Sequence, residues 1–260
     1  LVGSEMCIRD RYDSGLDCFR EYIQNAFDAC KMMLWHEMKN GRTKRDKLQE
    51  ITPFDIDNKM YEELAVEIHV TVEKQKVYFQ IRDFGVGMEE ECVNSLSVIG
   101  RSWKNRSLYQ KAAIEMPAWL KPTGGFGIGL QSAFMLTDQV KIVTRSVQEI
   151  NSHTLVLNSP ARKGTVTRSE EGAVPVGTEI TFEVSLNKMA GMLKEVSELK
   201  LDRHTELNLT FKKDCEDGFR KENITDYMIR FLKYYVARTF PDTLSVSYTH
   251  LRAHETAANL

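Results

Sequence analysis

Residues 83–88 read Asp-Phe-Gly-Val-Gly-Met, and they directly follow a segment in which apolar and polar residues alternate. This alternation, from Leu64 to Asp83, predicts a hairpin of two strands that turns near Gln75. An acidic residue at the end of a strand, followed by two glycines, lets the backbone turn sharply and approach a ligand closely. The same six residues also fit a plain strand-to-helix turn with a capping aspartate.

Toward the N-terminus, residues 21–29 read Glu-Tyr-Ile-Gln-Asn-Ala-Phe-Asp-Ala inside a helix that we predict from Asp17 to Met38, because its apolar residues recur at helical spacing. At about 100° per residue, Asn25 lies roughly 40° from Glu21, and Asp28 lies roughly 20° away on the other side. Two carboxylates and an amide therefore share one narrow stripe. A solvated face of an amphipathic helix is the plain alternative.

Toward the C-terminus, residues 124–130 read Gly-Gly-Phe-Gly-Ile-Gly-Leu and precede a helix predicted from Gly129 to Leu136. The amide groups of such a loop can face an anion, and the dipole of the following helix favours negative charge there. No Gly-Lys-Ser or Gly-Lys-Thr follows, so the loop is not a Walker phosphate loop, and it lacks the strand and acidic residue of a Rossmann motif. A flexible hinge is the plain alternative.

The remaining pattern predicts the fold class. Four short strands are expected after the glycine-rich motif, at Val140 to Arg145, His153 to Leu157, Gly164 to Arg168 and Thr178 to Val184, and further helices at 89–99, 187–200 and 225–236. Helix, hairpin, helices and then consecutive strands indicate an α+β protein. We expect a two-layer sandwich in which helices cover one face of a mixed, mostly antiparallel sheet.

Composition narrows the function classes. The chain has 260 residues, of which 42% are hydrophobic and 28% charged, as is usual for a soluble globular protein. The net charge of -2 gives no reason to expect a nucleic acid or an anionic membrane as partner. No apolar run approaches the ~20 residues that cross a bilayer. Of the five cysteines, Cys7 lies in the N-terminal segment discussed below; the other four, Cys18, Cys30, Cys92 and Cys215, show no metal spacing, and we expect them to be free thiols in a reducing, cytoplasmic compartment.

The three motifs, in this order, resemble the ATP-binding domain of the gyrase, heat-shock-chaperone, histidine-kinase and MutL superfamily, and most closely that of the ninety-kilodalton heat-shock chaperone family. The likeness spans Cys18 to about Val184. It includes residues 95–102, which resemble the segment leading into that family's lid, and Gly177-Thr178 before the last strand. MutL proteins would carry an Arg-Gly-Glu-Ala run that is absent here, and histidine kinases usually lack an acid at the place of Glu21. The resemblance implies a Bergerat-type fold.

The resemblance also implies site roles. Glu21 would be the general base that activates the attacking water, Asn25 would ligate Mg²⁺ through its amide oxygen, and Asp83 would accept a hydrogen bond from the adenine amine. Gly87 would let the adenine lie close, and Met88 would pack against it. The backbone amides of Gly125, Phe126, Gly127 and Gly129 would bind the phosphates, and the Thr178 hydroxyl would contact the adenine site. Asp28 would either take part in nucleotide binding or only stabilise the helix and the pocket. Candidate contacts to the ribose and phosphates are Ser95, Arg101 and Ser102.

The implied function is ATP binding with slow, Mg²⁺-dependent hydrolysis, coupled to closure of a lid formed by Arg101 to Thr123. In the family this closure drives homodimerisation, here through regions outside the chain. The chain departs from the family in two places. The connection from Lys39 to Leu64 is longer, and the lid sequence is unusual, with Trp103, Pro117 and Trp119. The two tryptophans are interpreted as core residues or as a partner surface. These departures leave open an alternative, a nucleotide-sensing module of a signalling or defence protein. A phosphotransfer kinase core is a third reading.

The two ends of the chain are expected not to belong to the natural protein. Codons that encode residues 1–10 have a reverse complement that encodes residues 246–255, which indicates one sequencing adapter translated in both orientations. We therefore expect adapter-derived residues at 1–11 and 246–260. The ATP-binding domain is expected at 12–185, and a C-terminal extension, which is the start of a following domain on one reading, at 186–245.

Overall fold

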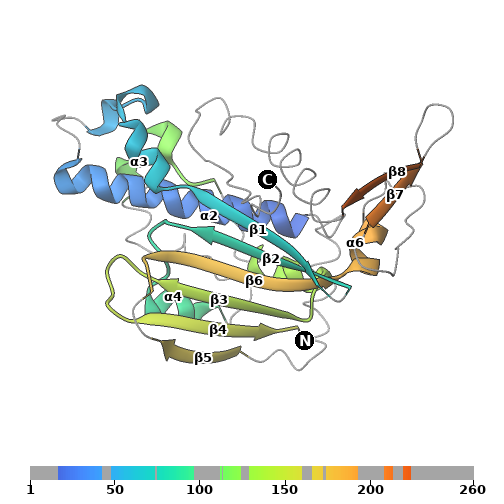
Figure 1. The fold of residues 1–260 in the computed structure, drawn as a ribbon. Helices are drawn as coiled ribbons and strands as arrows, with labels where there is room; N and C mark the ends of the chain where they lie inside the picture. Colours follow the sequence, from blue (N-terminus) through green and yellow to red (C-terminus); the bar gives the residue numbers. More distant parts are fainter. Residues whose placement is uncertain are drawn as a thin grey trace.

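The computed structural model describes residues 17–42, 48–73, 75–96, 112, 114–123, 129–159, 166–171, 174–192, 208–212 and 219–223. Within these ranges one long helix lies along a six-stranded sheet, and a separate two-stranded hairpin follows near the C-terminus (Figure 1). Among the described residues, no helix is both long enough and apolar enough to cross a membrane.

The long helix is α2, Asp17–Glu37, which confirms the helix predicted over these residues. It continues into a π-helical turn, η1, Met38–Arg42, and the helical backbone breaks at Gly41, whose φ is 87°. Glycine reaches this left-handed conformation without the clash that a Cβ atom would cause, so it is the natural residue to end the helix.

The main sheet contains β1 (Val66–Glu73), β2 (Lys76–Asp83), β3 (Gln139–Arg145), β4 (Ser152–Asn158), β5 (Val166–Glu171) and β6 (Gly177–Ser185). Its strand order is β1-β2-β6-β3-β4-β5, and every pairing is antiparallel. The predicted hairpin is confirmed, with Gln75 at its turn in a left-handed conformation of φ 66°. The predicted sandwich is confirmed too; β5 is described from Val166 onward, and Gly164, where this strand was predicted to start, lies outside the described residues.

The core lies between α2 and one face of the sheet. Alternate residues of β2 and β6 point toward the helix, and their aromatic rings meet those of α2: the Phe19 and Phe79 centroids are 4.8 Å apart, and the Phe79 and Phe182 centroids are 5.3 Å apart. The ring centroid of Tyr22 lies 5.7 Å from that of Phe182. All four rings are buried, so removal of apolar surface from water holds the helix against the sheet.

A second apolar cluster packs around the C-terminal half of α2. The unusually long connection supplies much of it, through two 3-10 turns, η2 (Leu48–Glu50) and η3 (Pro53–Asp55), and a short helix, α3 (Asn58–Glu63), which the sequence did not predict. Its buried members are Leu34, Trp35, Met38, Ile51, Ile56, Met60, Tyr61, Met116 and Leu120. Trp119 packs against this cluster and donates a 2.7 Å hydrogen bond to the carbonyl of Ile51. The core reading of Trp119 is therefore confirmed, whereas Trp103 lies outside the described residues.

The remaining elements are short. They are α4 (Glu90–Ser95), η5 (Ala118–Leu120), η6 (Gly129–Met135), α6 (Leu186–Met192), β7 (Asn208–Lys212) and β8 (Phe219–Asn223). The helix predicted to start at Gly129 is a 3-10 helix, and its Ala133 is fully buried in the main core. Cys18, Cys30 and Cys92 are free thiols, as predicted, and Cys215 lies outside the described residues.

Candidate functional site

A row of polar residues crosses the helix-covered face of the sheet where β2 ends. Asp83 of β2 pairs with Thr178 of β6, and Thr178 pairs with Thr144 of β3. The three side chains share the face that carries Phe79 and Phe182, because side chains two residues apart in a strand point to the same side. All three are buried, with exposed fractions between 0% and 7%. The sheet register therefore places the acid of the Asp-x-Gly-x-Gly motif beside two hydroxyl groups.

The hydroxyl of Thr144 is the centre of this row. Its Oγ1 accepts a 2.9 Å hydrogen bond from the amide of Met88 and lies 3.1 Å from the carbonyl oxygen of Gly177, to which it donates. The Oγ1 atoms of Thr144 and Thr178 are also 3.1 Å apart. One buried hydroxyl thus joins β3, β6 and the turn after β2, which fixes the relative positions of Met88 and Thr178.

Asp83 is held in an environment that disfavours its charge. Burial raises the pKa of its carboxyl from 3.8 to about 7, while hydrogen bonds from the amides of Gly85 and Thr178 and the charge of Arg82 act in the opposite direction. The Gly85 amide lies 2.9 Å from Asp83 Oδ1. Burial also raises the pKa of the Cys30 thiol, and the Asp83 charge adds to that rise. A buried carboxyl with incompletely compensated desolvation is common at functional sites.

The turn after Asp83 is clamped between α2 and the segment that follows β3. The amide of Val86 donates to the carbonyl of Ala29 in α2 at 3.2 Å, and the carbonyl of Val86 accepts from the amide of Val147 at 2.9 Å. A Cβ atom on Gly85 would lie 2.4 Å from the carbonyl carbon of Ala29. The glycine at this position therefore permits the close approach of the turn to the helix.

Gly87 is required for two reasons. Its φ of 67° is in the left-handed region, and a Cβ atom on it would lie 2.0 Å from the carbonyl oxygen of Arg145. The space beside its Cα is thus filled by the backbone of β3. The contact between Gly87 and an adenine ring remains a prediction, as does stacking by Met88, which is half-buried against the main core.

Glu21 and Asn25 lie one turn apart on α2, and both are half-buried rather than fully solvated. The side chain of Glu21 is 24% exposed, and its Oε1 lies 3.5 Å from Nη2 of Arg20. On the face of α2 opposite this stripe, Tyr22, Ile23 and Ala26 are buried against the sheet. The predicted catalytic pair therefore occupies the margin of the α2 interface, which suits groups that must meet both water and a ligand.

Asp28 has a different environment from the other two members of the stripe. It is fully buried, and its Oδ1 accepts hydrogen bonds from Gln24 Nε2 at 3.1 Å and from the amide of Thr123 at 3.0 Å. Gln24 Nε2 also donates to Thr123 Oγ1 at 2.6 Å. Thr123 directly precedes the glycine-rich motif, so the residue before this motif is hydrogen-bonded to the turn of α2 that follows Asn25.

Several predicted contacts cannot be placed in the structure. Arg101, Ser102, Gly125, Phe126 and Gly127 lie outside the described residues. Gly129 begins η6 and Ser95 ends α4, and their backbones alone are described. Their roles stay predictions.

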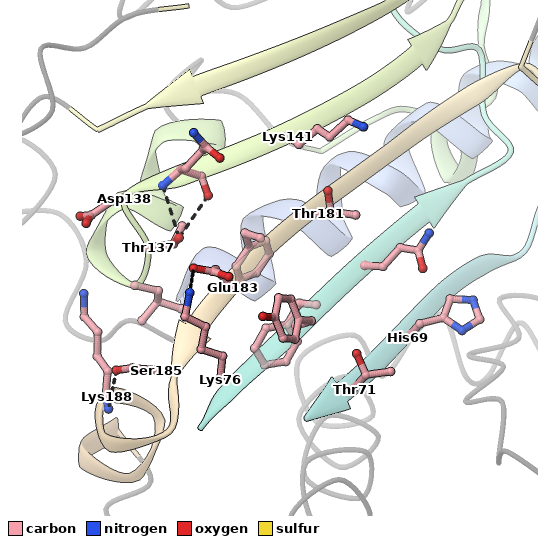
Figure 2. Close-up of a pocket in the computed structure, with 16 residues that line it drawn as sticks. His69, Thr71, Lys76, Thr137, Asp138, Lys141, Thr181, Glu183, Ser185 and Lys188 are labelled. Atoms are coloured by element: carbon pink, nitrogen blue, oxygen red, sulfur yellow. Dashed lines mark hydrogen bonds and ion pairs between the residues drawn. The ribbon is translucent and has the colours of Figure 1, made fainter. Parts of the chain in front are cut away.

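A cavity of ≈ 650 Å³ lies on the opposite face of the sheet (Figure 2). It is lined by outward-pointing residues such as Gln80, Lys141 and Thr181, with α2 behind the strands in this view. Lys76 and Glu183 form an ion pair at its edge. Because none of the described motif residues lines this cavity, we assign the candidate site to the helix-covered side, where Asp83 is.

The amide of Asn25 is the one protein group that the sequence predicts as a ligand of Mg²⁺. Among the described residues, no three His, Cys, Asp or Glu side chains gather closely enough to bind a metal ion. Mg²⁺ keeps several waters and is commonly bound through one or two protein oxygens and the phosphates of a nucleotide. A single amide oxygen, from Asn25, is consistent with that mode.

Sequence reasoning missed Gln24, Thr123 and Thr144. Gln24 shares the stripe of α2 and stands four residues before Asp28, a spacing that brings helical side chains together, so this pair carried a local signal. Thr144 carried none, because its place beside Thr178 depends on the register between two strands far apart in sequence. The only sequence signal for Thr123 was its position directly before the glycine-rich motif.

Comparison with known proteins agrees with this picture. The chain is similar to the chaperone protein HtpG of Nitrobacter winogradskyi, with 27% identity over 205 residues, which are 74% of this chain and 29% of that protein. It is 37% identical over 119 residues to HtpG of Chlorobium phaeovibrioides, covering 44% of this chain and 18% of that protein. It is 29% identical over 144 residues to the mitochondrial heat shock protein 75 kDa of Bos taurus, and these residues are 55% of this chain and 18% of that protein.

These relatives confirm the resemblance to the ninety-kilodalton heat-shock chaperones. The chain spans less than a third of the length of each of them. No protein-family model matches the chain.

Proposed function

We propose that this chain, which is related to the HtpG chaperones, binds ATP with Mg²⁺ and hydrolyses it slowly. The observation that carries the proposal is that two of the three motifs, and the residue that precedes the third, converge on one stretch of α2. Glu21 and Asn25 stand on that stretch, the turn after Asp83 packs on Ala29, and Thr123 is bonded to Asp28.

Adenine recognition is proposed for the polar row. The carboxylate of Asp83 would accept a hydrogen bond from the exocyclic amine, and the hydroxyl of Thr178 would complete the contact, directly or through a water. Thr144 would hold Thr178 and Met88 in place through the hydrogen bonds described above. A ring that carries a carbonyl oxygen where adenine has its amine would face the carboxylate with an acceptor, so the row would favour adenine over guanine.

Hydrolysis is proposed to depend on Glu21. Its carboxylate would take a proton from a water that attacks the γ-phosphorus; the new oxygen–phosphorus bond forms while the bond to the β-phosphate oxygen breaks, and ADP leaves. Mg²⁺, when bound through Asn25 and the phosphates, would neutralise the charge that develops on the oxygens. Arg20, whose Nη2 is 3.5 Å from Glu21 Oε1, would help to orient that carboxylate.

Closure of a lid is proposed to couple binding to a larger change of shape. Part of the predicted lid is already packed: Met116 and Leu120 are buried in the cluster around α2, and Thr123 is bonded to the helix. Chaperone activity, homodimerisation and a cytoplasmic location are proposed for the whole protein on the strength of the HtpG relatives.

The test is ATP turnover and ATP affinity of the full chain and of its Glu21→Ala variant. We expect turnover to fall by about 100-fold or more, the usual contribution of a general base, with affinity little changed. Glu62→Ala is the matched control, because Glu62 is exposed on α3, away from the motifs. Equal turnover in wild type and Glu21→Ala would exclude Glu21 as the base.

A further inference from the structure

We infer that Glu149 and His153 are positioning residues, which hold the start of α4 and, through it, Met88 beside the proposed adenine site. This inference rests on the proposed nucleotide function and extends it to two side chains outside the three motifs. Glu149 lies in the turn between β3 and β4, and His153 lies near the start of β4. Both would act through protein contacts, without touching the nucleotide.

The polar row that begins at Asp83 continues across the sheet to His153. Thr144 of β3 pairs with His153 of β4 on one side and with Thr178 of β6 on the other. Residues directly opposite each other on neighbouring strands point to the same face, so His153 points to the helix-covered side. Its side chain is only 3% exposed, and Leu155, two residues further along β4, is buried in the main core. A buried imidazole at this place needs a hydrogen-bonding partner.

Glu149 supplies such a partner and divides its two carboxylate oxygens between two groups. Its Oε2 lies 3.3 Å from Nε2 of His153, and its Oε1 accepts a 2.9 Å hydrogen bond from the amide of Glu90. Figure 1 shows α4 beside the turn that joins β3 to β4. Because both oxygens are engaged, a rotation of the carboxyl group would break both contacts. His153 thus fixes the direction from which Glu149 meets α4.

The start of α4 depends on this contact from another element. The first amides of a helix have no acceptor within the helix itself. Glu90 is the first residue of α4, and the carboxylate that accepts from its amide lies 59 residues further along the chain. Glu149 therefore ties α4 to the connection between β3 and β4, as a capping side chain would.

The contact with α4 also affects Met88, two residues before Glu90. Two hydrogen bonds hold the chain ahead of α4, one at the carbonyl of Val86 and one at the amide of Met88. Glu149 adds a third at the amide of Glu90, so every second residue of this stretch is bonded to the end of β3 or to the turn after it. Without the third bond, the backbone would be held up to Met88 and released after it. An adenine ring that packs on Met88 would then have to restore the lost order, which costs affinity.

The experiment measures the affinity for adenosine and for Mg-ATP, and the KM and kcat of ATP hydrolysis, in the full chain and in two variants of Glu149. Glu149→Leu removes the acceptor, and we expect it to weaken both ligands by a similar factor, about 3- to 10-fold, as for loss of one hydrogen bond. KM should rise by that factor while kcat stays within about 2-fold, because the change concerns the adenine half of the site. Glu149→Gln keeps an acceptor oxygen on a side chain of the same length, and it should restore both affinities to within about 2-fold of the wild type.

The part played by His153 is tested in combination with Glu149. His153→Leu should weaken adenosine less than Glu149→Leu does, and it should have no further effect in a chain that already carries Glu149→Leu. His153→Gln, whose amide can donate to the same carboxylate, should recover part of the loss. Additive losses from the two leucine substitutions would show that His153 does not act through Glu149. Should Glu149→Leu fail to fold, the comparison of His153→Leu with His153→Gln takes its place, and equal affinities in these two variants would contradict the inference.

Glu183→Leu is the matched control. Glu183 is a glutamate in an ion pair with Lys76 on the opposite face of the sheet, so its replacement should leave both affinities like those of the wild type (Figure 2). A readout without nucleotide is hydrogen exchange of the Glu90 amide, followed by NMR. This exchange should be faster in Glu149→Leu than in the wild type or in Glu149→Gln.

The outcomes separate this inference from the proposed function. If the wild type binds adenosine and Mg-ATP but Glu149→Leu binds them equally well, or if Glu149→Gln loses as much affinity as Glu149→Leu, the positioning role is overturned and the proposed function stands. If the wild type binds neither ligand, the proposed function fails, and the positioning role fails with it.

Discussion

Replacement of Asp83 by asparagine should make the protein more stable at neutral and alkaline pH. The carboxyl of Asp83 has a pKa of about 7 in the folded protein, against 3.8 when it is solvated. Between these two values the folded state holds a proton that the unfolded state has lost, so the free energy of unfolding falls as pH rises, and above about pH 7 the full penalty is present. The asparagine side chain carries no charge at any pH, so Asp83→Asn avoids this penalty.

The size of the effect on the unfolding free energy follows from the shift in the pKa of Asp83. A shift of about 3 pH units at about 1.4 kcal/mol each gives a full penalty of roughly 4 kcal/mol, of which about 1.5 kcal/mol is already present at pH 5. The difference in unfolding free energy between Asp83→Asn and the wild type should therefore grow by about 2 to 3 kcal/mol from pH 5 to pH 8. The prediction concerns only this change with pH, because replacing the protonated carboxyl by an amide alters the unfolding free energy by an amount that does not depend on pH.

Urea unfolding at several pH values, followed by tryptophan fluorescence, measures this difference. Gln80→Leu is the control: it lies on the opposite face of the sheet and changes no ionisable group, so its difference from the wild type should stay flat with pH. A flat difference for Asp83→Asn as well would refute the reasoning, since it would mean that the fold does not disfavour the Asp83 carboxylate.

Three further substitutions test the packing around the site, each by thermal or urea unfolding together with nucleotide affinity. Gly87→Ala should cost more than about 3 kcal/mol and abolish nucleotide binding, because the new Cβ would meet backbone at 2.0 Å. Gly41→Ala, with an equally left-handed φ but no atom of the described residues within 4 Å, should cost only about 1 kcal/mol, and equal costs would contradict this. Thr144→Val should cost about 1 to 3 kcal/mol and weaken adenosine binding, because the Met88 amide loses its acceptor. Thr154→Val should be neutral or stabilising, because the buried Thr154 hydroxyl has no hydrogen-bond partner among the described residues, and the reverse order of costs would be inconsistent with the hydroxyl network. Leu120→Ala should cost about 2 to 5 kcal/mol, since the side chain is fully buried in the second cluster, and a cost below about 1 kcal/mol would mean that this cluster does not hold the segment.

Local patterns predicted the parts of the fold that depend on short stretches of chain. The apolar spacing in α2 and the alternation in β1 and β2 were sufficient, because each element buries one face and the period of its burial is written in consecutive residues. The connection after Lys39 was not predicted: α3 has only six residues, too few for a clear period, and it is held by burial of Met60 and Tyr61 against residues far along the chain.

The candidate site, too, was predictable from the sequence only where it depends on a short stretch of chain. Glu21, Asn25 and Asp28 could be placed on one stripe from helical geometry alone. The different burial of Asp28 could not be foreseen, since it depends on Thr123, which approaches from 95 residues away. The row of Asp83, Thr178 and Thr144 likewise depends on strand order, because β6 inserts between β2 and β3 although it follows both in sequence.

The affinity of the full chain for Mg-ATP at pH 8, measured by calorimetric titration in the wild type and in Asp83→Asn, is the most direct test that these residues enclose an adenine nucleotide. Wild-type protein should bind one nucleotide per chain, while the variant, more stable yet presenting an amide donor to the adenine amine, should lose at least about 100-fold in affinity. If the stabilised variant bound Mg-ATP as tightly as the wild type, the nucleotide would have to lie elsewhere.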